Sequence, residues 1–371
     1  STAQSYVGKT DKVEILRDNT YSPIDISHET ESAGNIFYDY NMPEFNISFT
    51  DLSDEGASFK AEYNIYEYDK DMNPVLKQSG EKEYYGTSSE KVSYNAEKFG
   101  LYALELTLEG NVGDKVISQR EWIDFSKCVG NDNLDYKMGV GSHLIRNTDI
   151  PMEQALTIMT KGGFGLSRDD ISWGEYEKEK GVYELTDRQE EYFDLMAKYK
   201  LEPIIILSAS NALYDSAPNA FPSDDTLTSA YGNYVKNLLS EPKVSAVCSM
   251  IEAINEPDIL MKHNKTPQSV KIYTNTAEQN EERGRIYASI LKTTNQAVQE
   301  INTEKNEDYK LGGFSLCMIW TYNDPIKSPY LRFAEGALDE LDGEQAFDAL
   351  TLHPYGGPTD DPEIGEDGRE N

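Results

Sequence analysis

The chain has 371 residues and is strongly acidic, with 66 Asp and Glu against 34 Lys and Arg and a formal net charge of −32. This charge disfavours nucleic acid and anionic membranes as partners, because their affinity for proteins comes mainly from Lys and Arg. A neutral polymer such as a polysaccharide would not be repelled, and the 25 tyrosines offer aromatic faces that suit sugar rings. The length is sufficient for two domains with a sizeable core.

No apolar run of about 18 residues is present, so the sequence predicts no membrane span. The chain opens on Ser1-Thr2-Ala3 without an initiator Met, a basic stretch or an apolar leader, which we interpret as the mature N-terminus of a secreted or cell-surface protein. The three cysteines lack a CxxC spacing and the four histidines are scattered, so neither a disulfide framework nor a metal site is predicted. No cofactor is expected.

Residues 1–130 are predicted to form an all-β domain. Apolar and polar residues alternate with a period of two in four stretches, which predicts strands at 45–49, 59–66, 101–108 and 116–125. Short strands separated by turn-forming clusters are typical of a β-sandwich with one solvated face. The phrase Lys98-Phe99-Gly100-Leu101-Tyr102 resembles the hairpin entry of immunoglobulin-like accessory domains. Such a domain could bind carbohydrate or act as a spacer, and the spacer is the favoured interpretation.

From residue 131 to 371, predicted strands and helices alternate, which indicates a parallel sheet. Strands are expected at about 136–144, 164–173, 202–207, 245–256, 309–317 and 347–353, and helices at about 151–161, 187–199, 226–239 and 281–300. Pro151 is expected in the first turn of its helix and Asp187 as the cap of the next. Units of roughly 30 to 60 residues fit a (β/α)8 TIM-type barrel with long loops on one face, of which about six βα units are present.

The stretch from Ser245 to Leu260 is predicted as a buried strand that ends in a polar pair, Asn255 and Glu256. Because Pro257 has no N–H, it ends the ladder and biases Glu256 towards an extended backbone. A parallel barrel places its chemistry at this end of its strands. The low dielectric there is expected to raise the pKa of Glu256, as a proton donor requires. Alternatively, Glu256 caps the next helix.

Three motifs follow one another at this barrel spacing. The first is Arg168-Asp169-Asp170-Ile171-Ser172-Trp173, followed by Glu177 and Lys180-Gly181-Val182-Tyr183; the others are Asn255-Glu256-Pro257 and His353-Pro354-Tyr355. Together they resemble the pattern of glycoside hydrolase clan A. The β-xylosidase and α-L-iduronidase type is the most similar, with cellulases and β-galactosidases behind it. The resemblance covers about residues 136–356.

The resemblance implies an eight-stranded barrel that hydrolyses the glycosidic bonds of a carbohydrate substrate with retention. Glu256 would then be the general acid/base, Asn255 would hydrogen-bond the sugar 2-hydroxyl, and Arg168 would keep a neighbouring nucleophile ionised. The remaining residues implied at the sugar subsite are His353, Tyr355, Trp173, Trp320 and His143.

These residues also have structural interpretations. Arg168 could form a surface pair with one of the two aspartates that follow it, which contributes little stability. Trp173 could pack in the core beside the Lys-Gly-Val-Tyr turn. His353 could be a strand-end histidine with satisfied hydrogen bonds, and Trp320 could pack within a loop.

The clan's nucleophile is a Glu at the end of a seventh strand, and the sequence contains no such strand. Residues 356–371 are acidic and rich in Gly and Pro, which predicts a solvated loop or a disordered end. The chain could be part of a longer protein, a second polypeptide could complete the barrel, or the chain could be a partial barrel without hydrolytic activity. We favour the first two explanations, because an open barrel exposes its edges and core.

Two functions therefore remain. The first is a retaining glycoside hydrolase that acts on a poly- or oligosaccharide by double displacement, with its nucleophile outside this chain. The alternative is a non-catalytic carbohydrate-binding or structural surface protein built on a partial barrel.

Overall fold

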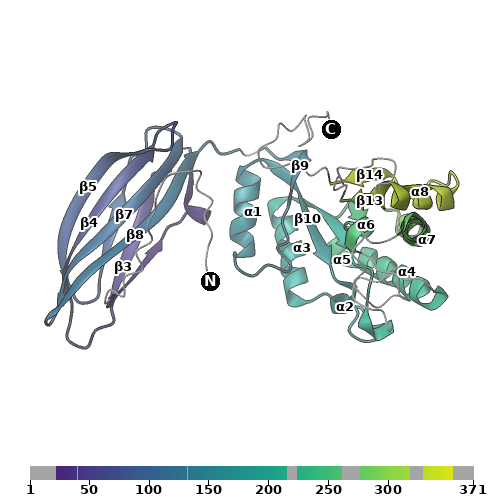
Figure 1. Ribbon diagram of the computed structural model, residues 1–371, viewed down its shortest axis with the longest axis horizontal. Coiled ribbons are helices and arrows are strands. Elements are labelled where there is room, and N and C mark those ends of the chain that lie inside the picture. The colour runs from purple at the N-terminus through teal and green to yellow at the C-terminus, as the bar shows by residue number, and fades with distance from the viewer. Residues whose placement is uncertain are drawn as a thin grey trace. The chain divides into compact units, whose positions relative to one another are not determined.

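The computed structural model describes residues 22–39, 41–131, 133–214, 224–260, 276–317 and 329–353 (Figure 1). The chain divides into two compact units, Ser1–Gly130 and Asn131–Asn371, and each has its own hydrophobic core. Among the helices within the described ranges, none combines the length and the apolar character needed to cross a bilayer.

In the described part of the first unit, the strands form two sheets. One sheet contains, in spatial order, β2 (Ile36–Tyr38), β8 (Lys115–Cys128), β7 (Gly100–Val112), β4 (Ser58–Tyr68) and β5 (Pro74–Tyr85). The other contains β1 (Ile24–Glu29), β3 (Glu44–Asp51) and β6 (Ser88–Ser93), in the order β1-β3-β6, and a short 3-10 turn, η1 (Ala33–Asn35), precedes β2. The pairings are antiparallel except that β2 runs parallel to β8.

The period of two in the sequence separates the two faces of these strands. In β3, Phe45, Ile47 and Phe49 are buried, whereas the residues between them are exposed. The ring of Phe45 lies 5.2 Å from that of Phe125 in β8, so the two sheets share one apolar core. The strands predicted from this alternation correspond to β3, β4, β7 and β8.

Strand β5 was not predicted, because most of its residues are polar and exposed and show no apolar alternation. It is an edge strand that pairs with β4 along its whole length, from Ser58↔Tyr85 to Tyr68↔Pro74. The turn between the strands is closed by Asp69, whose Oδ1 accepts hydrogen bonds from the backbone N–H groups of Asp71 and Asn73, each at 2.9 Å. The turn chemistry and the partner strand specify β5, not burial.

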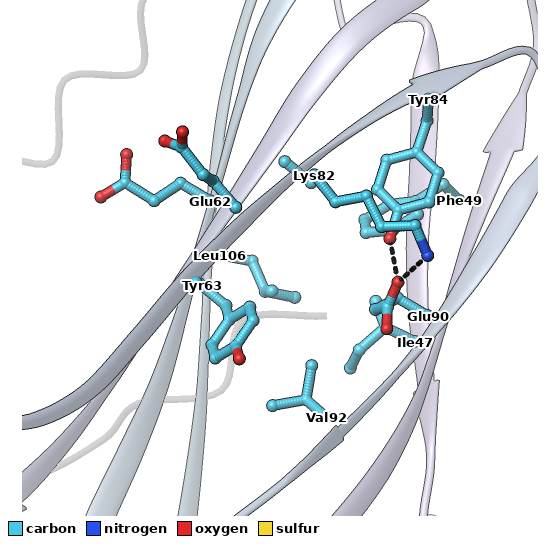
Figure 2. A pocket seen from close by; sticks show the side chains of 12 residues that line it. Ile47, Phe49, Glu62, Tyr63, Lys82, Tyr84, Glu90, Val92 and Leu106 are labelled. Carbon is cyan, nitrogen blue, oxygen red and sulfur yellow. Dashed lines mark hydrogen bonds and ion pairs between the residues drawn. The ribbon is translucent and has the colours of Figure 1, made fainter.

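A hollow of about 210 Å³ opens between the edge strands β5 and β6 (Figure 2). Its floor is apolar, and Glu90 lies near its mouth, where it accepts hydrogen bonds from Lys82 Nζ at 2.6 Å and from Tyr84 Oη. These hydrogen bonds lower the pKa of Glu90. Glu90 is therefore suited to holding the two edge strands together and not to donating a proton.

In the second unit, the described strands form one parallel sheet whose spatial order follows the chain. The strands are β9 (Asp135–Gly141), β10 (Phe164–Ile171), β11 (Glu202–Leu207), β12 (Met250–Glu252), β13 (Lys310–Leu316) and β14 (Ala349–Leu352). The helices are α1 (Met152–Lys161), α2 (Trp173–Tyr176), α3 (Asp187–Tyr199), α4 (Asp225–Ser240), α5 (Pro242–Ser245), α6 (Pro257–Leu260), α7 (Ala277–Lys305) and α8 (Pro329–Leu341), with a 3-10 turn η2 (Ala212–Tyr214). This sheet fits part of a TIM barrel, as the sequence predicts.

Helices cover one face of this sheet and leave the other more open. Along β10, Ser167 and Asp169 are buried, whereas Arg168 and Asp170 are half-buried. Tyr192 of α3 donates a hydrogen bond to Ser167 Oγ at 3.0 Å, so the helices pack on the Ser167 face. Arg168 and Asp170 consequently belong to the opposite face.

Two local predictions in this unit need correction. The helix expected to be capped by Asp187 is capped by Thr186, which forms a capping box with Gln189. The strand expected over 245–256 contains only Met250–Glu252, because Pro242 and Pro257 each begin a short helix, α5 and α6.

Candidate active site at the carboxyl edge of the parallel sheet

The parallel register brings the ends of distant strands to one edge. Arg168 of β10 is in register with Ile204 of β11, which is in register with Met250 of β12. Residues that follow these positions therefore gather at the carboxyl edge of the sheet, where side chains from several strands can converge on one site.

Arg168 makes the central ion pair of this edge. Its Nε donates to Glu252 Oε2 at 3.0 Å and its Nη2 donates to Glu252 Oε1, so the contact is bidentate. The same Nη2 donates to Asn255 Oδ1 at 2.8 Å. Because the Glu252 side chain is only 3% exposed, its charge depends on the guanidinium. The alternative in which Arg168 forms a surface pair with Asp169 or Asp170 is wrong.

Glu256 is held by His353. Its Oε1 lies 2.9 Å from His353 Nδ1, and the two side chains are 12% and 17% exposed. Arg168 Nη2 approaches the other ring nitrogen, Nε2, at 3.4 Å. Because an arginine can only donate, Nε2 is the acceptor, and the arrangement assigns the neutral Nδ1–H tautomer to His353.

The backbone of Glu256 departs from the prediction. Its φ is 45°, in the left-handed region that non-glycine residues rarely adopt, and not in the extended region expected before a proline. The N–H of Glu256 donates to the carbonyl of Ser315 in β13 at 3.1 Å, which anchors this conformation. Backbone strain of this kind occurs preferentially at functional sites.

Arg168, Asn255, Glu256 and His353 thus form one connected network with Glu252. Arg168 and His353 are 185 residues apart in the chain, so only the sheet brings them together. The sequence analysis missed Glu252. The available signal was a carboxylate inside the apolar run Met250–Glu252, at the register of an arginine inside another strand.

Trp173 does not line this site. It is fully buried, stacks on Tyr234 with ring centroids 5.6 Å apart, and donates from Nε1 to Glu177 Oε2 at 2.6 Å. Glu177 Oε1 also accepts from Gly181 N at 2.7 Å and from Tyr214 Oη at 2.6 Å. The proposed stacking on sugar is therefore corrected: Trp173 packs in the core, and this part of the motif holds a loop together.

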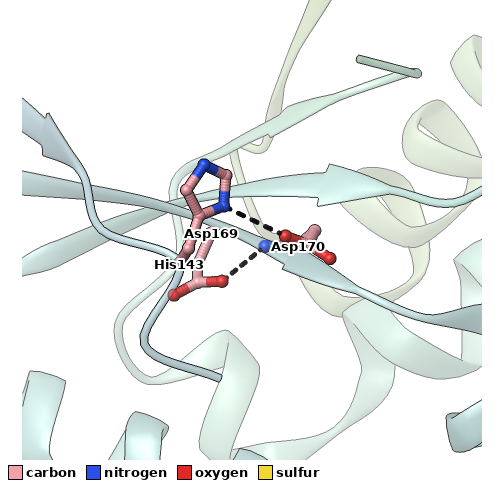
Figure 3. Close-up of side chains that lie close together, drawn as sticks. All are labelled: His143, Asp169 and Asp170. Carbon is pink, nitrogen blue, oxygen red and sulfur yellow. Dashed lines mark hydrogen bonds and ion pairs between the residues drawn. The ribbon is translucent and has the colours of Figure 1, made fainter. Parts of the chain in front are cut away.

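His143 follows β9 and lies beside Asp169 and Asp170 (Figure 3). One ligand atom from each lies within 4.8 Å of the others, a spacing that a metal ion could bridge. A guanidinium already has this place, because Arg146 Nη2 donates to His143 Nδ1 at 2.8 Å and Arg146 Nε lies 3.5 Å from Asp170 Oδ1. His143 is half-exposed and is held in a cluster that is internally paired.

Asp169 faces the helix side of the sheet and is engaged by three donors. Its carboxylate accepts hydrogen bonds from the backbone N–H of Ile145 and of Asp170 and from Ser142 Oγ, at 3.2, 2.8 and 3.1 Å. Burial raises the pKa of Asp169. Its role in the cluster is to fix the loop after β9. The remaining predicted subsite residues, Tyr355 and Trp320, lie outside the described residues.

No protein-family model matches the chain, and no curated protein matches it. Its structure is similar to that of a family 39 glycoside hydrolase from the gut symbiont Bacteroides cellulosilyticus WH2, with a TM-score of 0.58 and 20% sequence identity. The alignment covers 91% of this chain and 59% of that chain. This chain therefore has the fold of that protein over most of its own length and spans a little over half of the larger molecule.

Two further solved glycosidases align less well. The exo-β-1,4-mannosidase Op5Man5 from Opitutaceae bacterium strain TAV5 has a TM-score of 0.32 and 18% identity over 44% of this chain and 27% of that chain. The β-glucosidase from Thermotoga maritima has a TM-score of 0.32 and 16% identity over 43% of this chain and 36% of that chain. The structural neighbours are thus glycoside hydrolases, in line with the clan A resemblance at the level of the fold.

Proposed function

We propose that this chain carries the acid/base side of a retaining glycoside hydrolase site that acts on a poly- or oligosaccharide. The observation that supports the proposal is the pairing of Glu256 with His353 at the carboxyl edge, next to Asn255 on Arg168. In such a site Glu256 protonates the glycosidic oxygen as the bond to the anomeric carbon breaks. It then removes a proton from the water that releases the sugar.

The neighbouring groups have separate tasks in this mechanism. His353 donates to Oε1 of Glu256 and so orients the carboxyl group, which leaves the transferable proton for the other oxygen. Arg168 fixes the amide of Asn255 through its oxygen, so that the amide N–H₂ group is available to a sugar hydroxyl. Glu252 balances the charge of Arg168 and keeps it in place.

The nucleophile is proposed to come from a seventh strand, supplied by a longer form of this chain or by a second polypeptide. Exposed apolar side chains on both edge strands support this arrangement. Met138 on β9 is 52% exposed and Leu350 on β14 is 59% exposed, and closing the barrel would cover such edges. In a retaining site the two carboxyl groups lie about 5–5.5 Å apart.

Finer features also belong to the proposal. The first unit is proposed to be an immunoglobulin-like sandwich that serves as an accessory domain, because its two sheets enclose a single core. A β-xylosidase-like or iduronidase-like specificity and export from the cell are proposed from the sequence motifs and the acidic composition.

The complete gene product tests the acid role through the leaving group. Glu256→Gln is expected to lower the rate on unactivated oligosaccharides by about 10²–10⁴-fold, because their leaving oxygen needs a proton. Formation of the glycosyl-enzyme from a dinitrophenyl glycoside should be nearly unaffected, since this leaving group needs none. Glu175→Gln, an exposed residue of the same unit, is the matched control.

Equal losses on both kinds of substrate would remove Glu256 from the acid role. Oligosaccharide binding without turnover in the complete protein would support the non-catalytic alternative. Azide added to Glu256→Ala gives an independent check, because it attacks the glycosyl-enzyme without a general base and should restore turnover of the activated substrate.

A further inference from the structure

The end of β13 has an unusual backbone next to the candidate site. Phe314 and Ser315 have φ values of 77° and 43°, both in the left-handed region, although neither is a glycine. The register with β14 shifts between Phe314 and Leu316, so a bulge lies here. Each left-handed non-glycine residue costs on the order of 1–3 kcal/mol, so other contacts must hold the bulge in place.

Two hydroxyl groups hold the bulge. The backbone N–H of Phe314 donates to Tyr287 Oη of α7 at 2.7 Å. The N–H of Ser315 donates to Thr351 Oγ1 of β14 at 3.0 Å, and the hydroxyl groups of these two residues lie 2.6 Å apart. Thr351 Oγ1 in turn donates to the carbonyl of Gly313 at 2.8 Å. The bulge is therefore braced from the helix side and from the neighbouring strand.

Three consecutive residues at this point contact both members of the Glu256–His353 pair. The carbonyl of Ser315 accepts from the N–H of Glu256 at 3.1 Å, and the carbonyl of Leu316 accepts from the N–H of His353 at 2.9 Å. The N–H of Cys317 donates to the two carboxylate oxygens of Asp258, at 3.1 and 3.2 Å. Asp258 lies two residues after Glu256, so Glu256 is tied to β13 on both sides.

Asp258 is buried, and its surroundings make this attachment specific. Arg283 of α7 is also buried and donates from Nη2 to the carbonyl of Pro257 at 3.0 Å, which fixes the turn from the other direction. Burial raises the pKa of Asp258 to about 6, and the charge of Glu256 raises it further, whereas Arg283 opposes the shift. The side chain keeps a carbonyl-type acceptor for Cys317 in either protonation state.

We propose that Asp258 and the Phe314–Ser315 bulge form a clip that sets the position of Glu256 against His353. Asp258 and Thr351 are then positioning residues: neither touches the substrate, and both act through the backbone of β13. The inference rests on the proposed function for its meaning in catalysis. The clip itself is a statement about the contact between Glu256 and His353.

The test reads the tautomer of His353 in the chain by ¹⁵N NMR at a pH where the ring is neutral, with His353→Gln to assign its signals. The wild-type chain is expected to show the Nδ1–H form. Asp258→Ala removes the acceptor for Cys317 and should move most of the His353 population to the Nε2–H form that free histidine favours. Asp258→Asn keeps one acceptor oxygen and should retain the Nδ1–H form. The signals of His28, in the first unit, are the internal control.

Thr351→Val supplies a second test without opening a cavity, because valine has nearly the same shape and lacks the hydroxyl that accepts from Ser315 N. It is expected to change the His353 tautomer in the same direction as Asp258→Ala, and Thr351→Ser should preserve it. If Asp258→Ala does not fold, Thr351→Val decides. A folded variant of either kind with the wild-type tautomer overturns the clip.

This reading does not depend on turnover. An inactive complete protein in which the tautomer changes as expected would reject the proposed function and leave the clip in place. An active protein with an unchanged tautomer would do the opposite.

Discussion

Glu177 and Glu256 are both glutamates of short motifs in the second unit, and both are shielded from bulk water, but their partners differ. Glu177 is fully buried and accepts from neutral donors, an indole, a backbone N–H and a phenol. Glu256 is 12% exposed, and its partner is an imidazole that can itself titrate. One carboxylate is locked inside a loop, whereas the other faces the open edge of a sheet.

This difference separates scaffold from chemistry within one sequence signature. A carboxylate surrounded by fixed neutral donors is stabilised as an anion and rigidifies the groups around it. A carboxylate beside a histidine at a partly open edge can exchange a proton with a bound molecule. Both residues match the clan A pattern, so the match alone does not say which one reacts. The predictions below test this separation, from the largest expected effect to the smallest.

Glu177→Ala should be the most destabilising substitution. It leaves the donors of Trp173, Gly181 and Tyr214 without their acceptor, and each unsatisfied buried donor costs about 1–3 kcal/mol. We expect a loss on the order of 5 kcal/mol in the free energy of unfolding, measured by urea denaturation. Glu175→Ala, an exposed neighbour in α2, should change it by less than about 0.5 kcal/mol. Similar losses for both variants would show that Glu177 is not the scaffold carboxylate.

Arg168→Met should lower the free energy of unfolding by about 3 kcal/mol, because it leaves the buried carboxylate of Glu252 without its counter-charge. The double variant Arg168→Met/Glu252→Gln should recover much of that loss, since both members of the pair are then neutral. Arg146→Met, which removes an exposed guanidinium at the same edge, is the control and should have a small effect. Additive losses in the double variant would argue against a coupled pair.

Asp258→Asn should change how stability depends on pH. Burial raises the pKa of Asp258 to about 6 in the folded chain, above its value in the unfolded chain. Between these two values the folded state binds a proton that the unfolded state has lost, so this group stabilises the fold at low pH and the contribution disappears as pH rises through about 6.

Between pH 4.5 and 7.5, wild type should therefore lose about 2 kcal/mol relative to Asp258→Asn, which cannot titrate. Urea denaturation of both proteins at the two pH values measures this difference. A constant difference between them would mean that Asp258 is ionised throughout the range.

Tyr214→Phe should have the smallest effect, about 1 kcal/mol, because Glu177 keeps its other donors when this one is removed. The His353 tautomer should be unchanged, since the Glu177 contacts do not include the Glu256 network. A changed tautomer would join the two carboxylates into one functional unit and remove the distinction drawn above.

Much of the architecture could be predicted from the sequence, because strand and helix periodicity depends on neighbouring residues. Strand β11 lies at the predicted positions 202–207, and Phe45, Ile47 and Phe49 are buried as their alternation predicts. Order along the chain was also sufficient to predict a parallel sheet, since short alternating strands and helices have few other solutions. Edge strand β5 was missed because an exposed polar strand carries no such periodicity.

The sequence by itself determined the two-part organisation of sheets and the set of polar residues available at strand ends, because these follow from local patterns and chain order. Only the tertiary structure decided that Arg168 pairs with Glu252, that Glu256 adopts a left-handed backbone beside His353, and that Trp173 is buried. These outcomes depend on register and on contacts between residues up to 185 positions apart. Such contacts form only when the whole sheet is assembled, so no local pattern encodes them.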